Sequence, residues 1–141
     1  MSAQMFSIIY TGQQAPELKD LARSRAVMAL PLAGRYRAID FMLSNLVNSG
    51  ITNAGIVTQH NYHSLMDHVG SGKEWDLSRK QDGLFVLPPF VTNQNPGMYR
   101  GTLDALGGVM SYIRRSSQEY VLIIDDTAVY NTAFRKMMEY H

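Results

Sequence analysis

The chain contains no cysteine, and this absence excludes disulfides, thiolate metal sites and cysteine nucleophiles. Its formal charge of +1 gives no electrostatic reason to expect a nucleic-acid or membrane partner. No segment approaches the ~20 consecutive apolar residues of a membrane span. The N-terminus also lacks the basic and apolar regions of a signal peptide. We therefore expect a cytoplasmic protein.

What is present is an alternation of two kinds of apolar segment. The 141 residues, 45% of them hydrophobic, are enough for one domain with a core. Strands alternating with helices predict an α/β fold with a mostly parallel, Rossmann-like sheet and helices on both faces. The predicted strands are 6–10, 53–58, 84–87 and 120–124, and the predicted helices are 38–49, 61–69, 102–115 and 132–141.

In such a fold, ligands lie beyond the carboxyl ends of the strands. Three stretches are expected there: the loop after Tyr10, the turn before Thr102, and the pair Asp125 and Asp126. Within the predicted helices, Asn61 and Thr102 are expected to be N-caps. Helical spacing assigns Leu103 and Met110, with Leu106 and Ile113, to one face of the helix at 102–115.

The segment Pro31–Ile51 has the most regular pattern. Pro31 and Gly34 predict a turn. An amphipathic helix follows, and Gly50 is placed to end it. Its buried face is predicted to contain Ile39, Met42, Leu43, Leu46 and Val47.

Pro31–Ile51 resembles a signature of the ADP-glucose pyrophosphorylases (glucose-1-phosphate adenylyltransferases), which make ADP-glucose for glycogen or starch. Similarity continues through 58–68, through 86–89 and through 101–105. The resemblance implies the N-terminal portion of a nucleotidyltransferase (GT-A-like) domain over residues 1–141. It also implies that the rest of the catalytic domain and a C-terminal β-helix are absent.

The family's nucleotide-contacting motifs are only partly retained. Resemblance assigns a remnant of nucleotide binding to Gly12, Gln59, Arg100, Gly101 and Thr102. Arg100 stands where the family has a base-reading glutamine. Asp126 corresponds to the family's metal-binding aspartate, which implies Mg²⁺ as cofactor. An ordinary strand-end turn is the alternative explanation for Asp126, and an ordinary helix N-cap is the alternative for Thr102.

The departures concern catalytic groups. The family's glycine-rich loop, Gly-Gly-x-Gly-[Ser/Thr]-Arg-Leu, is replaced by residues 12–18, in which Pro16 has no amide donor. Glu17 replaces the family's arginine, and Val27 replaces its lysine. Phosphoryl transfer depends on positive charge and aimed donors at this place. We therefore predict that the catalytic set is lost.

This pattern, together with 70–78, resembles the D-type regulatory subunit of the bacterial enzyme. The implied partner is a catalytic ADP-glucose pyrophosphorylase subunit in a hetero-oligomer, expected to be a tetramer. ATP and glucose 1-phosphate are the candidate small ligands. The alternatives are an active sugar-phosphate nucleotidyltransferase and a module that serves assembly alone.

Other charged residues have two interpretations each. Arg25, Arg35 and Arg37 are candidates for binding phosphate or an anionic effector, or else ordinary surface charges. His60 and His63 are a weak zinc candidate, and a solvated helix face explains them better. Trp75 is expected to anchor its loop by packing.

Overall fold

A four-stranded parallel sheet forms the centre of the molecule. The structure is a computed structural model and describes residues 4–12, 15–89 and 98–141. The strands β1 (Met5–Thr11), β4 (Ala54–Thr58), β5 (Leu84–Leu87) and β6 (Tyr120–Asp125) lie in the order β5-β4-β1-β6. Strand β1 pairs on both edges, and all seven of its residues are buried.

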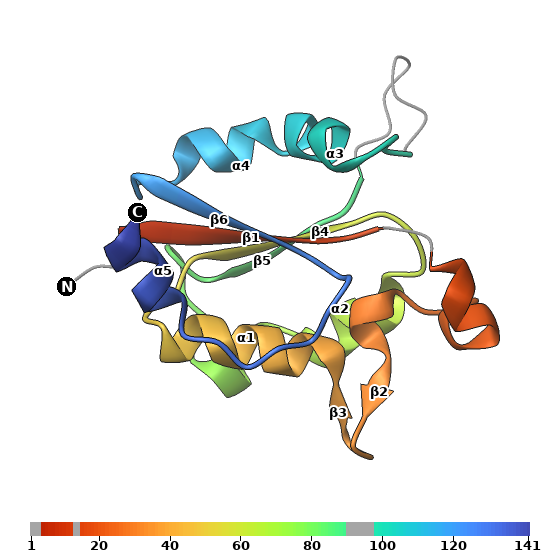
Figure 1. The fold of residues 1–141 in the computed structure, drawn as a ribbon. Helices are drawn as coiled ribbons and strands as arrows, with labels where there is room; N and C mark the ends of the chain where they lie inside the picture. The colour runs from red at the N-terminus through yellow and green to blue at the C-terminus, as the bar shows by residue number, and fades with distance from the viewer. Residues whose placement is uncertain (1–3, 13–14, 90–97) are drawn as a thin grey trace.

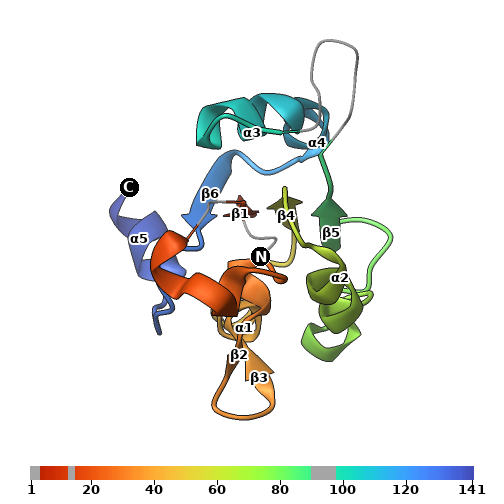
Figure 2. The ribbon, with the colours of Figure 1, turned by 90° about the vertical axis from the view of Figure 1, so that its right-hand side faces the viewer.

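Helices cover both faces of this sheet (Figures 1 and 2). The helices α1 (Ala38–Asn48), α2 (His63–Val69) and α5 (Phe134–Tyr140) lie on one side. The helices α3 (Thr102–Gly108) and α4 (Met110–Arg115) lie on the other. Each side has its own buried apolar cluster, so the predicted architecture is confirmed.

The helix predicted in Pro31–Ile51 forms as α1. Its residues Ile39, Met42, Leu43 and Leu46 are fully buried. Gly50 has a φ of 79°, and its N–H donates to the carbonyl of Val47 at 2.9 Å. The next amide, of Ile51, donates to the carbonyl of Leu46 at 2.9 Å, which completes a Schellman motif. Gly50 therefore ends α1 as predicted.

Short elements connect the sheet to its helices. The 3₁₀ helices η1 (Pro16–Ala22) and η2 (Val27–Ala29) follow β1, and a third, η3 (Lys73–Trp75), follows α2. A hairpin of β2 (Pro31–Leu32) and β3 (Tyr36–Arg37) forms the turn predicted around Gly34. Trp75 packs against the cluster on the α1 side, as expected. No helix within the described ranges is long and apolar enough to cross a membrane.

Three local predictions were wrong. Thr102 is the first residue of α3, and Gly101 occupies the N-cap position. Asn61 does not cap α2: it has a φ of 51°, and its side-chain amide donates to the carbonyl of Arg23 at 3.1 Å. The segment 102–115 is two helices rather than one, because Val109 leaves helical geometry (φ −110°, ψ 17°). That break follows two glycines, which weaken a helix by about 1 kcal/mol each.

The break also changes which side chains are buried. Leu103 is 85% exposed and Met110 is 37% exposed, although regular spacing assigned both to one face with Leu106 and Ile113. Ala105 and Val109 are the buried residues of this segment. Gly108 packs closely, since a Cβ there would lie 2.7 Å from the Tyr99 ring.

Two glycines provide opposite tests of packing. A Cβ at Gly55, in β4, would lie 2.7 Å from Cε1 of Tyr112, whose hydroxyl is held by Asn53. We predict that Gly55→Ala lowers the free energy of unfolding by about 1–3 kcal/mol because the ring must move. A Cβ at Gly107 would meet nothing within 4 Å, so Gly107→Ala should raise it by about 0.5–1 kcal/mol. Urea unfolding measures both, and equal effects would contradict the packing argument.

Candidate functional site

The carboxyl ends of β1, β4 and β6 meet at one edge of the sheet. The chain leaves β1 toward β4 on one side and returns to β6 on the other, so this edge is a topological switch point. Two adjoining cavities of about 380 and 410 Å³ open here, and both are lined by Gly12 and His60. We call them the η1 cavity and the α3 cavity.

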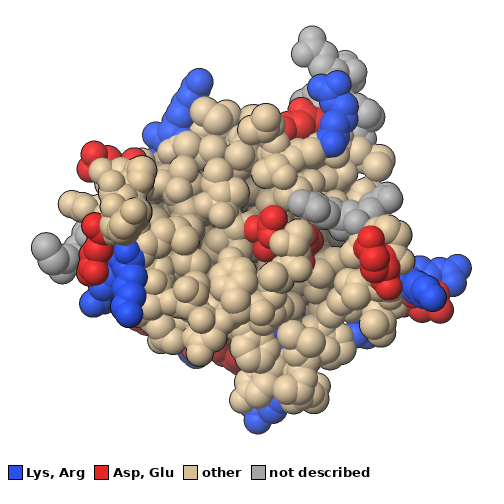
Figure 3. Space-filling model, in the orientation of Figure 1, with Lys and Arg blue, Asp and Glu red and all other residues tan. Residues whose placement is uncertain are grey.

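The η1 cavity lies between the end of β1 and the segment 15–27. Its charged residues are Asp126, Lys19, Arg23 and Arg25, and its remaining lining is Thr11, Gly12, Ala15, Pro16, Ala22, Ala26, Val27, His60 and Asn61. Figure 3 shows acidic and basic side chains together over the part of the surface formed by η1. The cavity therefore combines one buried carboxylate with three cationic side chains.

Asp126 is the electrostatic centre of the η1 cavity. It is 9% exposed, and burial, followed in smaller measure by the neighbouring Asp125, raises its pKa to about 6. The nearby Thr11 hydroxyl and Gly12 amide lower the pKa only in part. Neither Oδ2 of Asp126 nor Oγ1 of Thr11 reaches hydrogen-bond geometry with a partner among the described residues. The site thus contains a buried carboxylate oxygen that Thr11 and Gly12 approach without a hydrogen bond of good geometry from any described residue.

Asp125 differs from Asp126 in position and contacts. It is exposed, and its Oδ1 accepts hydrogen bonds from the Thr127 amide at 3.2 Å and the Thr127 hydroxyl at 2.5 Å. This is an Asx turn at the end of β6. Of the two adjacent aspartates, Asp126 is the one that lines the cavity.

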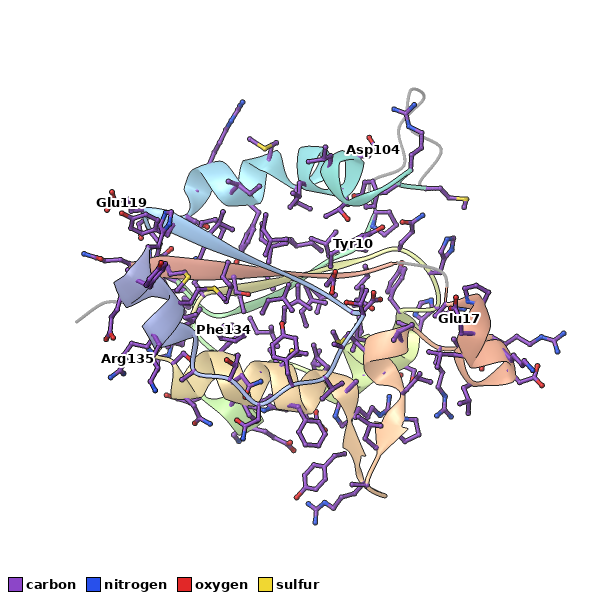
Figure 4. The ribbon with its side chains drawn as sticks, viewed as in Figure 1. Tyr10, Glu17, Asp104, Glu119, Phe134 and Arg135 are labelled. Carbon is purple, nitrogen blue, oxygen red and sulfur yellow. The ribbon has the colours of Figure 1, made fainter. Side chains whose placement is uncertain are left out.

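The α3 cavity contains all five residues that the sequence assigned to a nucleotide-binding remnant. It is lined by Gly12, Gln59, Arg100, Gly101 and Thr102, together with Tyr10, His60, Met98 and Tyr99. Figure 4 shows Tyr10 between the sheet and α3, with Asp104 on α3 nearby. The fold therefore gathers these residues from β1, β4 and the start of α3.

Gln59 is held by its neighbours. It is buried, its Oε1 accepts a hydrogen bond from the Tyr10 hydroxyl at 3.2 Å, and its Nε2 donates to the carbonyl of Tyr99 at 3.1 Å. Burial, and in smaller measure the Asp126 carboxylate, raises the pKa of Tyr10, so this hydroxyl stays protonated as the donor. A Cβ at Gly12 would lie 2.9 Å from Cβ of Gln59, and so the chain itself requires a glycine there.

Arg100 and Gly101 are open to solvent. The Arg100 side chain is 91% exposed, with its Nε 3.7 Å from Oδ2 of Asp104. The Arg100 amide donates to the same oxygen at 3.1 Å. Gly101 is extended, and a Cβ there would meet nothing within 4 Å. Nothing in the described chain requires a glycine at 101.

The three arginines predicted as anion ligands do not come together. Arg25 lines the η1 cavity, whereas Arg35 lies in the β2–β3 turn with its guanidinium 5.7 Å from the centre of the Tyr36 ring. Arg37 donates from Nη1 to the carbonyl and hydroxyl of Ser64 at 2.8 and 2.7 Å. Arg37 thus ties the start of α1 to α2.

The two residues that depart from the family signature, Glu17 and Val27, also lie in different places. Val27 lines the η1 cavity, but Glu17 is exposed on η1 and is absent from the lining (Figure 4). Conversely, Lys19 and Arg23 line the cavity although the sequence did not single them out. A cluster of basic residues directly after a strand-end loop is the signal that could have found them. Arg23 pairs with Asp20 at 3.8 Å, but both side chains are largely exposed and the pair is weak.

The weak zinc candidate has no structural support in the described residues. His60 precedes α2 and lines both cavities, while His63 begins that helix and stacks on Tyr62. No group of three or more His, Cys, Asp or Glu side chains suited to a metal occurs in the ranges that the structure covers.

A solved structure shares this fold. The crystal structure of a putative glucose-1-phosphate thymidylyltransferase from Bacillus anthracis superimposes with a TM-score of 0.72 at 20% sequence identity. The match covers 96% of this chain and 49% of that one. At this identity the likeness concerns the fold alone.

Sequence comparisons are more specific. A glucose-1-phosphate adenylyltransferase from Clostridium novyi is 39% identical over 138 residues, which are 98% of this chain and 36% of the relative. The glycogen biosynthesis protein GlgD of Bacillus subtilis is 43% identical over an alignment of 141 positions that covers 98% of this chain and 40% of the relative. The chain thus spans well under half the length of these relatives. The profile of the nucleotidyl transferase family matches residues 6–141, and the chain belongs to that family.

Proposed function

We propose that this chain carries the nucleotide-site region of a glucose-1-phosphate adenylyltransferase subunit in glycogen synthesis, and that this subunit is catalytically impaired and regulatory. In this role it associates with a catalytic subunit in the cytoplasm and changes that subunit's kinetics. The relatives named for adenylyl transfer and for glycogen biosynthesis support the pathway. The impairment and the regulatory role rest on the composition of the η1 cavity.

The observation that carries the proposal is the apolar side chain of Val27 in the lining of the η1 cavity, which also contains Asp126. The family signature has a lysine at this position. Phosphoryl transfer needs positive charge held against the phosphates, and an isopropyl group supplies none. Pro16, in the same lining, removes an amide donor from the loop that follows β1.

A second candidate, an active nucleotidyltransferase, is favoured by a different observation. Lys19 and Arg23, which the sequence alone did not single out, line the η1 cavity with the predicted phosphate candidate Arg25 and bring positive charge to it. Their side chains are exposed, whereas catalysis requires donors held in place. We therefore assign these cations to binding of ATP or a sugar phosphate without efficient turnover.

Mg²⁺ is the cofactor that the family implies, and the residues of the η1 cavity fit it. Asp126 offers a buried oxygen without a partner among the described residues. Mg²⁺ is commonly bound by one or two carboxylates together with substrate phosphates. Asp126 would hold the ion, which when bound supplies neutralisation of phosphate charge. The unpartnered oxygen, and not family membership alone, supports this assignment.

Association with a catalytic subunit gives the first test. The protein at its natural length is assayed for ADP-glucose formation alone and mixed with a catalytic glucose-1-phosphate adenylyltransferase. We expect turnover at least about 100-fold below that of the catalytic subunit, since one missing donor costs about 10²–10³ in kcat. We also expect co-elution and a changed KM or kcat in the mixture. Full activity alone would establish the second candidate, and co-elution without any kinetic change would indicate assembly alone.

Restoring the missing charges gives the second test. The double variant Glu17→Arg, Val27→Lys should raise ADP-glucose formation by at least about tenfold, because the lysine returns a cationic donor to the lining of the η1 cavity and the arginine reverses a negative charge on η1. The matched control is Glu17→Gln, Val27→Met, which removes the carboxylate and enlarges the side chain at 27 without adding positive charge. Equal rates for the two double variants would contradict the role assigned to these positions.

The third prediction concerns Asp126 and pH. Its pKa rises from an ordinary 3.8 to about 6 on folding, so the folded state retains the proton more tightly. Protonation of Asp126 therefore stabilises the folded state below about pH 4. This stabilisation is lost as the pH rises from about 4 to about 6. At about 1.4 kcal/mol per pH unit, Asp126→Asn should remove up to about 3 kcal/mol of this loss. Urea unfolding at pH 4 and pH 7.5 measures it, with the exposed Asp125→Asn as control.

The same two variants test the metal assignment. At pH 7.5, Mg²⁺ with ATP should raise the unfolding midpoint of the wild type and of Asp125→Asn, since a ligand that binds only the folded state stabilises it. Asp126→Asn should show a smaller rise. A rise of equal size in all three proteins would remove Asp126 from the metal site.

A further inference from the structure

A third cavity lies away from the switch-point edge. It has a volume of about 630 Å³, within the usual range for small-molecule sites, and shares no lining residue with the η1 and α3 cavities. It runs along β5, the edge strand, under α4. Asn53 and Asp82, which precede β4 and β5, place one end of it at the amino ends of the strands. We call it the β5 groove.

The apolar part of the β5 groove is an aromatic shelf. The rings of Phe85 and Tyr112 lie 5.7 Å apart at an angle of 56°, and Leu87 and Val109 also line the groove. Phe85, on the edge strand, remains 36% exposed. A planar ring stacked on this shelf would remove its apolar surface from water.

The shelf is held in place before any ligand arrives. The Tyr112 hydroxyl donates to Oδ1 of Asn53 at 2.7 Å, and Gly55 leaves room for the ring beneath. Nδ2 of Asn53 in turn donates to Oε1 of Gln118 at 3.0 Å. Burial, and secondarily the charge of Asp82, raises the pKa of Tyr112, so the hydroxyl remains a neutral donor. A wall fixed in this way loses little conformational entropy on binding.

The charges around the groove favour an anion. Its one carboxylate, Asp82, accepts a hydrogen bond from Nε2 of Gln118 at 3.1 Å. Lys80 and Arg115 also line the groove, are exposed, and have no ion-pair partner within the described part of the chain. The balance of charge at the groove is positive.

We propose that the β5 groove is a second small-molecule site, which binds a planar ring carrying one anionic group, with the ring on Phe85 and the anion between Lys80 and Arg115. The site is separate from the switch-point cavities and does not depend on the function proposed for them. Its volume suits a molecule of a few hundred daltons rather than a folded partner.

Phenyl phosphate is a probe that combines both features. Isothermal titration calorimetry on the protein at its natural length should show it binding at least about fivefold more tightly than inorganic phosphate, because only the aryl ring can use the shelf. Phe85→Ala should weaken phenyl phosphate binding about tenfold, whereas Phe85→Tyr, which keeps the ring, should not. Phe85 is partly exposed, so neither variant removes a fully buried side chain.

A charge variant keeps the test independent of Phe85. Lys80→Gln combined with Arg115→Gln should weaken binding about threefold to tenfold, whereas the control pair Arg114→Gln and Lys136→Gln should leave it unchanged. Arg25→Gln, in the η1 cavity, should leave the part of the phenyl phosphate binding that Phe85→Ala removes unchanged.

Four results would overturn the proposal. The first is inorganic phosphate binding as tightly as phenyl phosphate. The second is unchanged affinity in both the Phe85→Ala variant and the charge variant. The third is absence of phenyl phosphate binding up to about 10 mM, and the fourth is loss of all phenyl phosphate binding in Arg25→Gln.

Discussion

Strand β1 is paired on both edges by parallel neighbours and covered on both faces by helices, and this double burial determines where chemistry can occur. A strand so enclosed is mostly apolar, and β1 has no exposed residue, with Ser7 and Thr11 buried among its apolar side chains. Because its neighbours are parallel, three carboxyl ends meet at one edge, beside Gly12, Gln59 and Asp126. The order of the strands determines where the two switch-point cavities lie, and the loops that follow the strands determine which residues line them.

Residues that shape the switch-point edge are held mainly by one another. Gln59 joins Tyr10 to the backbone of Tyr99, and Gly12 gives it room. On the helical side, Oδ1 of Asp40 lies 2.6 Å from Nε2 of His68, while Oδ2 accepts from the Arg37 amide at 2.8 Å. These contacts stabilise the scaffold without needing a substrate. A chain of this family can therefore retain its architecture while the charges that serve catalysis are replaced.

The sequence predicted most of the fold because its main helices and strands have clear patterns of apolar residues and clear end signals. The buried face of α1 and its end at Gly50 follow from helical spacing and from the freedom of glycine to adopt positive φ. Prediction failed where two local rules compete. Thr102 has a side chain suited to capping, yet Gly101 occupies the N-cap position. The apolar spacing predicted one helix across Gly107 and Gly108, whereas the structure ends α3 at Gly108 and begins α4 at Met110. The lining by Lys19 and Arg23 depends on where η1 lies beyond the carboxyl end of β1, and the periodicity of the sequence does not predict that position.

Gly12 and Gly101 line the same cavity, yet they are under different kinds of constraint. Any side chain at Gly12 would collide with Gln59 and Tyr10, so natural selection for folding alone preserves that glycine. Gly101 has open space where a Cβ would lie, so only something outside the described chain can penalise its replacement. Among descendants of an inactive subunit, Gly12 should persist and Gly101 should drift. Substitution of Gly101, rather than of Gly12, is therefore the change that indicates when a ligand ceased to bind.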